Sequence, residues 1–280
     1  MNMRYAVIGN PVAHSRSPAI HEHFARAAGI ALRYERILAP LDGFRAAVEA
    51  FRAAGGRGLN VTVPFKREAF LLAHEHGVEA SQAQAVNTLS FGRQEPDVIR
   101  GDNTDGTGLV RDLVEREDFV LRGRSVLILG AGGAARGIVG PLLDAGVGRL
   151  TVTNRSRANA ARLVRDLAEA EGRAHRLREV ALDRVEPGFD LVIDASGSGL
   201  RNEPVALADE VLAAARLACD LFYAAQPTVF MRQARAAGCT RVCDGLGMLV
   251  EQAAESFRLW HGVHPDTAPV YRTLRASLQG

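Results

Sequence analysis

Four short, nearly continuous apolar runs in the second half of the chain constrain its fold more than any other feature. They cover residues 125–129, 150–153, 191–194 and 217–220, and the segments between them are long enough to carry crossover helices. Such runs are typical of parallel strands that are buried on both faces of a sheet. The alternation predicts βαβ units and therefore an α/β fold.

The first half shows a similar alternation of apolar runs and helical patterns. Amphipathic helices are expected near residues 17–29 and 41–54. Strands are expected at 4–9, 33–38, 58–63, 87–91 and 98–101. This half is therefore also predicted to form an α/β structure with a mostly parallel sheet.

The length of 280 residues suits two domains. A polar helix over residues 104–118, followed by the link 121–124, marks the predicted boundary. We expect one α/β domain over residues 1–105 and a Rossmann-like domain over 106–245. The helical segments over 246–280 are expected to pack back on the first domain.

A glycine-rich turn follows the first strand of the second half. Gly130, Gly132 and Ala135 match the pattern G-x-G-x-x-A. The first glycine permits a tight turn, the second removes a side chain where a pyrophosphate approaches, and the small third residue lets the helix pack on the strand. The helix N-terminus offers free amides to phosphates. A strand before the turn and a helix after it favour a nucleotide site over a purely structural turn.

The next strand ends in the segment Asn154, Arg155, Ser156 and Arg157. NAD-selective sites usually place Asp or Glu here to bind the ribose hydroxyls, and this segment has no acidic residue. Arg155 is expected to stack on the adenine and hold a 2′-phosphate, with Ser156 and Arg157 beside it. The pattern therefore favours NADP(H) over NAD. The alternatives are a solvated arginine loop and a methyltransferase that uses S-adenosylmethionine, which would also need an acidic residue here.

Lys66 is the single lysine among the 34 basic residues of the chain. Arginine keeps its proton in proteins, whereas a lysine ammonium is compact and can titrate. The chain uses arginine wherever a positive charge alone is enough, so we interpret Lys66 as a residue that handles a proton. The alternative is one remaining surface lysine of no individual importance.

Further polar side chains follow strands of the first half: Ser15, Ser17, Thr62, Asn87 and Asp105. Open α/β sheets bind ligands at the carboxyl ends of their strands. Ser17 and Asp105 also suit the start of a helix, so helix capping is the alternative role for each. Taken together with Lys66, the set suits a small ligand that is rich in hydroxyls and carries a carboxylate.

Composition excludes several classes of function. The formal net charge is +2, and the basic residues form no run with interleaved aromatic residues, so nucleic acid is not an expected partner. No apolar run reaches the ~20 residues that span a bilayer, and the apolar N-terminal segment is too short for a signal peptide. We therefore expect a cytoplasmic protein that does not bind membranes.

Cysteines and histidines give no metal signal. Cys219, Cys239 and Cys243 have the wrong spacing for a zinc site or a disulfide framework, so they are expected to be small buried residues. Two histidine pairs have i,i+2 spacing, which points the two side chains of a helical pair in different directions. These pairs are His21 with His23 and His74 with His76.

The motifs occur together in a specific order. They are residues 9–11 with 14–18, 60–66, 85–88, 102–106, 130–134 and 244–250 with Gln252. Because of these motifs, the chain resembles the shikimate dehydrogenase (shikimate/quinate dehydrogenase) family over essentially its whole length. The resemblance implies an oxidoreductase of aromatic amino acid biosynthesis that uses NADP(H) to reduce 3-dehydroshikimate reversibly to shikimate. It also implies a substrate domain before the Rossmann-like domain, and a monomer or homodimer.

The resemblance implies roles for individual residues. Lys66 and Asp105 are expected to form the catalytic pair. The expected substrate-binding residues are Ser15, Ser17, Thr62, Lys66, Asn87, Asp105, Tyr223 and Gln252. The expected cofactor-binding residues are Gly130, Ala131, Gly132, Gly133, Ala134, Asn154, Arg155, Ser156, Arg157, Leu221 and Gly245.

The chain departs from the family pattern at two places. Asn159 occupies the second basic position of the pattern Asn-Arg-Thr-x-x-Lys/Arg, so Arg157 is expected to substitute and selectivity for NADP to be weaker. The family stretch Asn-Ala-Thr-Ser-x-Gly appears as Asp-Ala-Ser-Gly-Ser-Gly over residues 194–199, close to the expected cofactor. The alternatives are an enzyme that also accepts quinate or NAD, and a non-catalytic metabolite sensor. Retention of Lys66 and Asp105 counts against a sensor.

Overall fold

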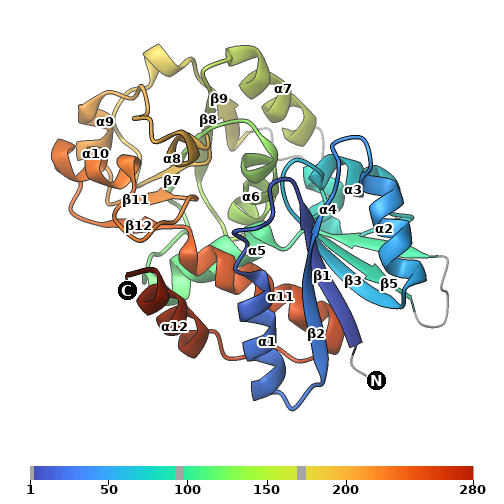
Figure 1. The fold of residues 1–280 in the computed structure, drawn as a ribbon. Coiled ribbons are helices and arrows are strands. Elements are labelled where there is room, and N and C mark those ends of the chain that lie inside the picture. The colour runs from blue at the N-terminus through green and yellow to red at the C-terminus, as the bar shows by residue number, and fades with distance from the viewer. Residues whose placement is uncertain (1–2, 93–97, 169–174, 280) are drawn as a thin grey trace. The chain divides into compact units, whose positions relative to one another are not determined.

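The computed structural model describes residues 3–92, 98–168 and 175–279. It divides into two compact units, Met1–Gly108 with Val250–Arg272 (unit 1) and Leu109–Leu249 with Thr273–Gly280 (unit 2). Within the described residues each unit contains one six-stranded sheet (Figure 1). The predicted α/β class is therefore confirmed. Among the described residues, no helix has both the length and the apolar character that crossing a membrane requires.

Unit 1 is built on a mixed sheet with the order β2-β1-β3-β5-β6-β4. Its strands are β1 Met3–Gly9, β2 Leu32–Leu38, β3 Gly56–Val61, β4 Glu75–His76, β5 Thr88–Phe91 and β6 Ile99–Asp102. Strand β1 pairs in parallel with both β2 and β3, while β5 is antiparallel to both of its neighbours, β3 and β6. The five strands predicted for this half are present within about two residues of their expected ends, and the short β4 was not predicted.

Helices cover both faces of this sheet. They are α1 Ser17–Ala27, α2 Phe44–Ala53, α3 Lys66–Leu72, α4 Val78–Ala83 and most of α11, which spans Leu246–His261. Successive side chains of a strand point to opposite faces. Ala6 and Ile8 of β1 therefore pack in the core that contains Phe44, whereas Tyr5 packs with Trp260 of α11 on the other face.

Unit 2 has a parallel sheet with the order β12-β11-β10-β7-β8-β9. Its strands are β7 Ser125–Leu129, β8 Arg149–Thr153, β9 Leu177–Glu179, β10 Leu191–Asp194, β11 Leu217–Asp220 and β12 Val242–Asp244. Every neighbouring pair is parallel, as the continuous apolar runs predict. The chain order reverses between β7 and β10, which makes this pair the switch point where doubly wound sheets bind ligands.

Both faces of this sheet are also covered. Val126 and Ile128 of β7 pack in the core with the side chains of α6, and Leu127 and Leu129 pack in the core with those of α10. The helices are α6 Gly133–Asp144, α7 Arg157–Ala168, α8 Ser198–Arg201, α9 Asp209–Ala213, α10 Val229–Ala237 and the part of α12 (Ala268–Gln279) from Thr273 onward, with a short 3₁₀ turn at Leu182–Arg184.

The predicted boundary helix over residues 104–118 has two parts. Helix α5 covers Asp105–Arg111 and continues as a π-helical turn over Asp112–Arg116. Asp112 is buried, accepts a hydrogen bond from Arg116 Nε at 2.9 Å, and lies where a side chain at Gly247 would collide with its carboxylate. Only glycine therefore fits at position 247.

Candidate functional site

Lys66 and Asp105 lie in direct contact in unit 1. Each is the first residue of a helix, α3 for Lys66 and α5 for Asp105, and the Lys66 Nζ donates a hydrogen bond to Asp105 Oδ2. The lysine side chain is 19% exposed and the aspartate side chain 7% exposed. A carboxylate in the first turn of a helix is also favoured by the helix dipole. The amine is therefore paired, yet it keeps some access to solvent and to a ligand.

Asn87 fixes the other carboxylate oxygen of Asp105. Its Nδ2 donates to Asp105 Oδ1 at 2.8 Å, and its Oδ1 accepts from the backbone N–H of Thr104 at 2.9 Å. A carboxylate can only accept and a backbone N–H can only donate, so these two contacts determine which way the amide faces. Gln252 Oε1 lies 3.4 Å from the same Nδ2. Four of the predicted substrate residues are thus joined through hydrogen bonds.

Ser15 and Ser17 form a second pair at the carboxyl end of β1. Ser15 Oγ donates to Ser17 Oγ at 3.2 Å and accepts from Ser17 N at 3.3 Å. The carbonyl of Ser15 is held by two guanidinium nitrogens of Arg36, at 2.7 and 3.1 Å. The residue before helix α1 is Arg16, and no side-chain hydrogen bond caps this helix within the described part of the chain. Ser17 therefore does not cap α1.

Thr62 lies beside the end of β1. Its backbone N–H donates to the carbonyl of Ile8 at 3.0 Å, and a side chain at Gly9 would collide with the Thr62 methyl group. Glycine at position 9 therefore allows the loop after β3 to approach the loop after β1. This approach places the loops that carry Ser15, Ser17 and Thr62 at one edge of the sheet.

The glycine turn of unit 2 has the geometry that a phosphate cradle needs. Gly130 has φ +115°, and a Cβ there would lie 2.7 Å from the carbonyl carbon and oxygen of Ala195 in the loop after β10. A Cβ at Gly132 or Gly133 would meet no heavy atom within 4 Å, so this backbone borders open space. Helix α6 begins at Gly133, and no side-chain hydrogen bond caps it within the described residues. Its first amides are therefore open to phosphates.

The loop after β8 lies next to this turn, because the Gly130 N–H donates to the Thr153 carbonyl at 2.7 Å. The two arginines of this loop differ in their contacts. Arg157 donates to the Glu179 carboxylate at 2.9 and 3.3 Å, whereas Arg155 is exposed and has no hydrogen bond or ion pair within the described residues. Arg155 is therefore free to meet a ligand, whereas two nitrogens of Arg157 are already engaged by Glu179.

The last three strands of unit 2 end in a row of aspartates. Asp194, Asp220 and Asp244 are in register across β10, β11 and β12, and all three are buried. Each carboxylate accepts the backbone N–H two residues further on, which turns the chain away from the sheet. A side chain at Gly245 would collide with the Leu221 carbonyl, so these two predicted cofactor residues lie in contact.

Asp220 is the central member of this row. Its pKa is raised to about 6, chiefly by burial, with the Thr228 side chain and the Phe222 N–H opposing the shift and the neighbouring Asp194 and Asp244 adding to it. Its Oδ2 has no hydrogen-bond partner among the described residues. The family pattern that the chain resembles has asparagine at position 194, so the Asp194 carboxyl stands where that pattern has an amide.

The structure adds residues to the predicted set. Asn60, Thr88, Thr104 and Ser256 are buried and hydrogen-bond to one another or to Asn87. The first three lie inside or beside the motifs, but their role was not predicted. Ser256 follows Gln252 by four residues on α11, and this i,i+4 spacing, which places both on one helix face, is the signal that could have found it.

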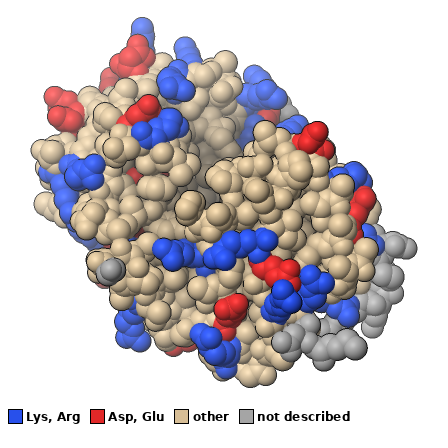
Figure 2. Space-filling view, viewed as in Figure 1, with Lys and Arg blue, Asp and Glu red and all other residues tan. Residues whose placement is uncertain are grey.

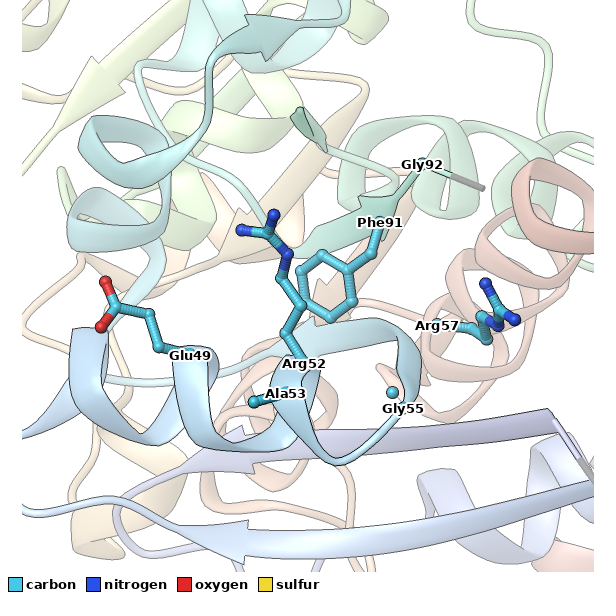
Figure 3. Close-up of a pocket in the computed structure, with 8 residues that line it drawn as sticks. Glu49, Arg52, Ala53, Gly55, Arg57, Phe91 and Gly92 are labelled. Carbon is cyan, nitrogen blue, oxygen red and sulfur yellow. The ribbon is translucent and has the colours of Figure 1, made fainter. Parts of the chain in front are cut away.

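A cavity of about 410 Å³ in unit 1 lies elsewhere. It opens at the start of β3 and the end of β5, with Arg52 beside Phe91 in its wall (Figure 3), and none of the predicted site residues lines it. Acidic and basic side chains are interspersed on the face of the molecule shown in Figure 2, as the small net charge suggests. Neither feature indicates a second candidate site.

Three family models match the chain: Shikimate dehydrogenase substrate binding domain over residues 7–89, Shikimate / quinate 5-dehydrogenase over 112–217, and Shikimate 5′-dehydrogenase C-terminal domain over 245–275. A shikimate dehydrogenase (NADP(+)) of Aromatoleum aromaticum is 55% identical, with 99% of this chain and 98% of that protein covered. One of Bordetella avium is 53% identical, with 98% and 96% covered. The crystal structure of Thermus thermophilus shikimate 5-dehydrogenase in complex with NADP(H) and shikimate is 33% identical, with a TM-score of 0.86 and 99% and 100% covered.

Proposed function

This chain belongs to the shikimate dehydrogenase family, and on that premise we propose that it is an NADP-dependent enzyme that reduces 3-dehydroshikimate reversibly to shikimate. The observation that carries the proposal is the contact between Lys66 and Asp105. The chain's single lysine is paired with a buried carboxylate, beside the amides of Asn87 and Gln252. This arrangement offers one titratable proton among several hydrogen-bonding groups.

Lys66 handles the proton in this mechanism. NADPH, when bound, supplies a hydride to the ring carbonyl carbon. The Lys66 ammonium polarises the carbonyl oxygen and gives it a proton, and in the reverse direction the neutral amine takes that proton back. A proton donor in such a position contributes about 10²- to 10⁴-fold in rate. Asp105 orients the ammonium and accepts a hydrogen bond from a ring hydroxyl.

The remaining predicted residues bind substrate and cofactor. In unit 1, the hydroxyls of Ser15 and Ser17 hold the substrate carboxylate, and Thr62, Asn87 and Gln252 meet its hydroxyls. Tyr223, which also belongs to the predicted substrate set, is part of unit 2. Unit 2 holds the dinucleotide at the glycine turn that begins at Gly130, at the loop 154–157, and at Leu221 and Gly245. Unit 1 is thus the substrate unit and unit 2 the cofactor unit.

The test is absorbance at 340 nm with four pairs of reactants. Shikimate with NADP is expected to give turnover at the highest kcat/KM, and the pairs with NAD or quinate are expected to be slower. Turnover of quinate at a similar kcat/KM would instead support a relaxed shikimate/quinate dehydrogenase. Tight binding of shikimate without reduction of NADP would contradict the proposal and support a metabolite sensor.

Arg155→Ala is expected to raise the KM for NADPH about 10- to 100-fold, because charge-assisted hydrogen bonds contribute about 1.5–3 kcal/mol. The KM for NADH should change less than twofold, since NADH has no 2′-phosphate. Arg157→Ala is the matched control, and a smaller effect is expected because Glu179 already holds that guanidinium. Equal effects of Arg155→Ala on both cofactors would show that Arg155 does not recognise the phosphate.

The expected cellular context is part of the same proposal. Cys219, Cys239 and Cys243 are free and buried, which suits a reducing compartment such as the cytoplasm. The enzyme is expected to act there as a monomer or homodimer.

A further inference from the structure

A buried polar network surrounds Asp105 in unit 1. Its members are Asn60, Asn87, Thr88, Thr104, Asp105 and Ser256, each at most 5% exposed. Burying this many polar groups is costly unless each finds a partner, and a fully satisfied network holds its members in one arrangement. The arrangement of these side chains therefore bears directly on the geometry of Asp105.

Ser256 is the point where three separate segments of this network meet. From α11, its Oγ accepts from Asn60 Nδ2 at 2.9 Å and lies 2.8 Å from Thr88 Oγ1 and 3.2 Å from Thr104 Oγ1. Because Thr88 gives its proton to Asn87 Oδ1, the proton in the Ser256–Thr88 contact must come from Ser256, and the carbonyl of Gln252, 3.0 Å away, is a second acceptor for it. One hydroxyl thus joins β3, β5 and the segment before α5.

The two threonines contact opposite ends of the Asn87 amide. Thr88 Oγ1 donates to Asn87 Oδ1 at 2.9 Å, and Thr104 Oγ1 accepts from Asn87 Nδ2 at 2.9 Å. Because Thr104 Oγ1 accepts there, its own proton can go to Ser256 Oγ or Asn87 Oδ1, both at 3.2 Å, or to Gln252 Oε1 at 3.5 Å. Asn87 Oδ1 already accepts from Thr88 Oγ1 and from the Thr104 N–H, so Ser256 is the nearer acceptor that remains. Ser256 therefore contacts both hydroxyls that hold the amide in place.

We propose that Ser256 is a positioning residue for Asp105. It holds Thr88 and Thr104 against the Asn87 amide, the amide holds one oxygen of Asp105, and the other oxygen holds the Lys66 ammonium. Ser256 touches neither reacting group and acts only through these neighbours. The inference rests on the proposed function, because it assigns a purpose to the geometry of Lys66 and Asp105.

Ser256→Ala is expected to lower kcat for shikimate about tenfold and to leave the KM for NADP within twofold. Without the hydroxyl, the nearest acceptors for Asn60 Nδ2 are Thr88 Oγ1 at 3.2 Å and the Asn87 carbonyl at 3.4 Å. Ser256→Thr keeps the hydroxyl and should restore kcat to within threefold. Ser277→Ala is the matched control, since Ser277 also donates back to a helix carbonyl, at 2.8 Å from Leu274 O, and should leave kcat unchanged.

A double-mutant cycle tests whether Ser256 acts through Asp105. In an Asp105→Asn background, Ser256→Ala should change kcat less than twofold, because residues that act as one unit are not additive. A full tenfold loss in that background, or a kcat within twofold of wild type for Ser256→Ala alone, would overturn the inference while leaving the dehydrogenase activity established.

A second measurement does not depend on turnover. The side-chain amide protons of Asn87, assigned by their loss in Asn87→Asp, should exchange with solvent at least tenfold faster in Ser256→Ala than in wild type or Ser277→Ala. Unchanged exchange would refute positioning by Ser256 even if the protein proved inactive on shikimate. Faster exchange in an inactive protein would support the network and reject only the proposed function.

Discussion

Replacing Lys66 by alanine is expected to lower kcat for shikimate about 10²- to 10⁴-fold, the usual contribution of a positioned proton donor. The affinity for NADPH should change little, because the predicted cofactor residues all lie in unit 2. Asp105 loses its cation but keeps the hydrogen bond from Asn87 at 2.8 Å, so the variant should fold with reduced thermal stability. Steady-state kinetics, NADPH titration and thermal unfolding measure the three effects.

Two further variants separate proton transfer from charge. Lys66→Arg keeps the positive charge but cannot release a proton, so it should lose nearly as much turnover as the alanine variant. Arg67→Ala removes an exposed cation one residue away and should leave kcat within twofold. Turnover of Lys66→Ala within tenfold of wild type would remove the amine from the chemistry. High activity of Lys66→Arg would reduce its role to that of a fixed charge.

The parallel sheet of unit 2 could be predicted because both of its faces are buried. Strands at 125–129, 191–194 and 217–220 need apolar side chains on both sides, which gives continuous runs at the predicted positions. Shorter strands gave no such signal. Leu177–Glu179 has only three residues, so it is too short for any periodicity to be read.

The mixed sheet of unit 1 was harder to predict from the sequence. Strand β5 was predicted as an element, but its antiparallel direction depends on pairing with β3 and β6, which are distant along the chain. The two-residue strand Glu75–His76 exists only through its pairing with β6. Strand direction and short edge pairing are tertiary properties, so local patterns do not contain them.

Some residues of the candidate site could likewise be predicted from the sequence, and others could not. Lys66 and Asp105 could be selected because a rare residue type and a motif mark them, and the structure shows them in contact. Ser256 has no such mark, since a serine inside a helix is common and its partners lie about 150 to 200 residues away in sequence. The contact between Arg157 and Glu179 was missed because β9 itself was missed.

No structural role was predicted for His21, because its i,i+2 spacing with His23 only argued against metal binding. It lies on α1, fully buried, with its ring stacked on Tyr34 at 4.5 Å and with Trp260 at 5.3 Å. Neither ring nitrogen has a hydrogen-bond partner among the described residues. Its pKa is lowered from 6.5 to about 3, chiefly by burial and further by the nearby His261, and the Asn60 side chain only partly opposes these two effects.

This shift makes unit 1 sensitive to acid. The pKa of His21 is about 3 when folded and 6.5 when unfolded, so between these values the unfolded chain binds a proton that the folded chain does not. The contribution of the neutral His21 ring to the free energy of unfolding is therefore fully present above pH 6.5, and it is lost as the pH falls toward 3. The loss is about 1.4 kcal/mol per pH unit, or ~3 kcal/mol at pH 4.

His21→Phe is expected to remove this dependence, because phenylalanine fits an aromatic site and has no group to protonate. The free energy of unfolding should match wild type within about 1 kcal/mol at pH 7.5 and exceed it by ~3 kcal/mol at pH 4. Trp260 is the only tryptophan of the chain and belongs to unit 1, so its fluorescence during urea unfolding follows that unit. His23→Gln, a change of the partly exposed histidine on the same helix, should keep the wild-type slope. Parallel pH profiles for wild type and His21→Phe would mean that His21 takes up a proton as readily in the folded protein as in the unfolded chain.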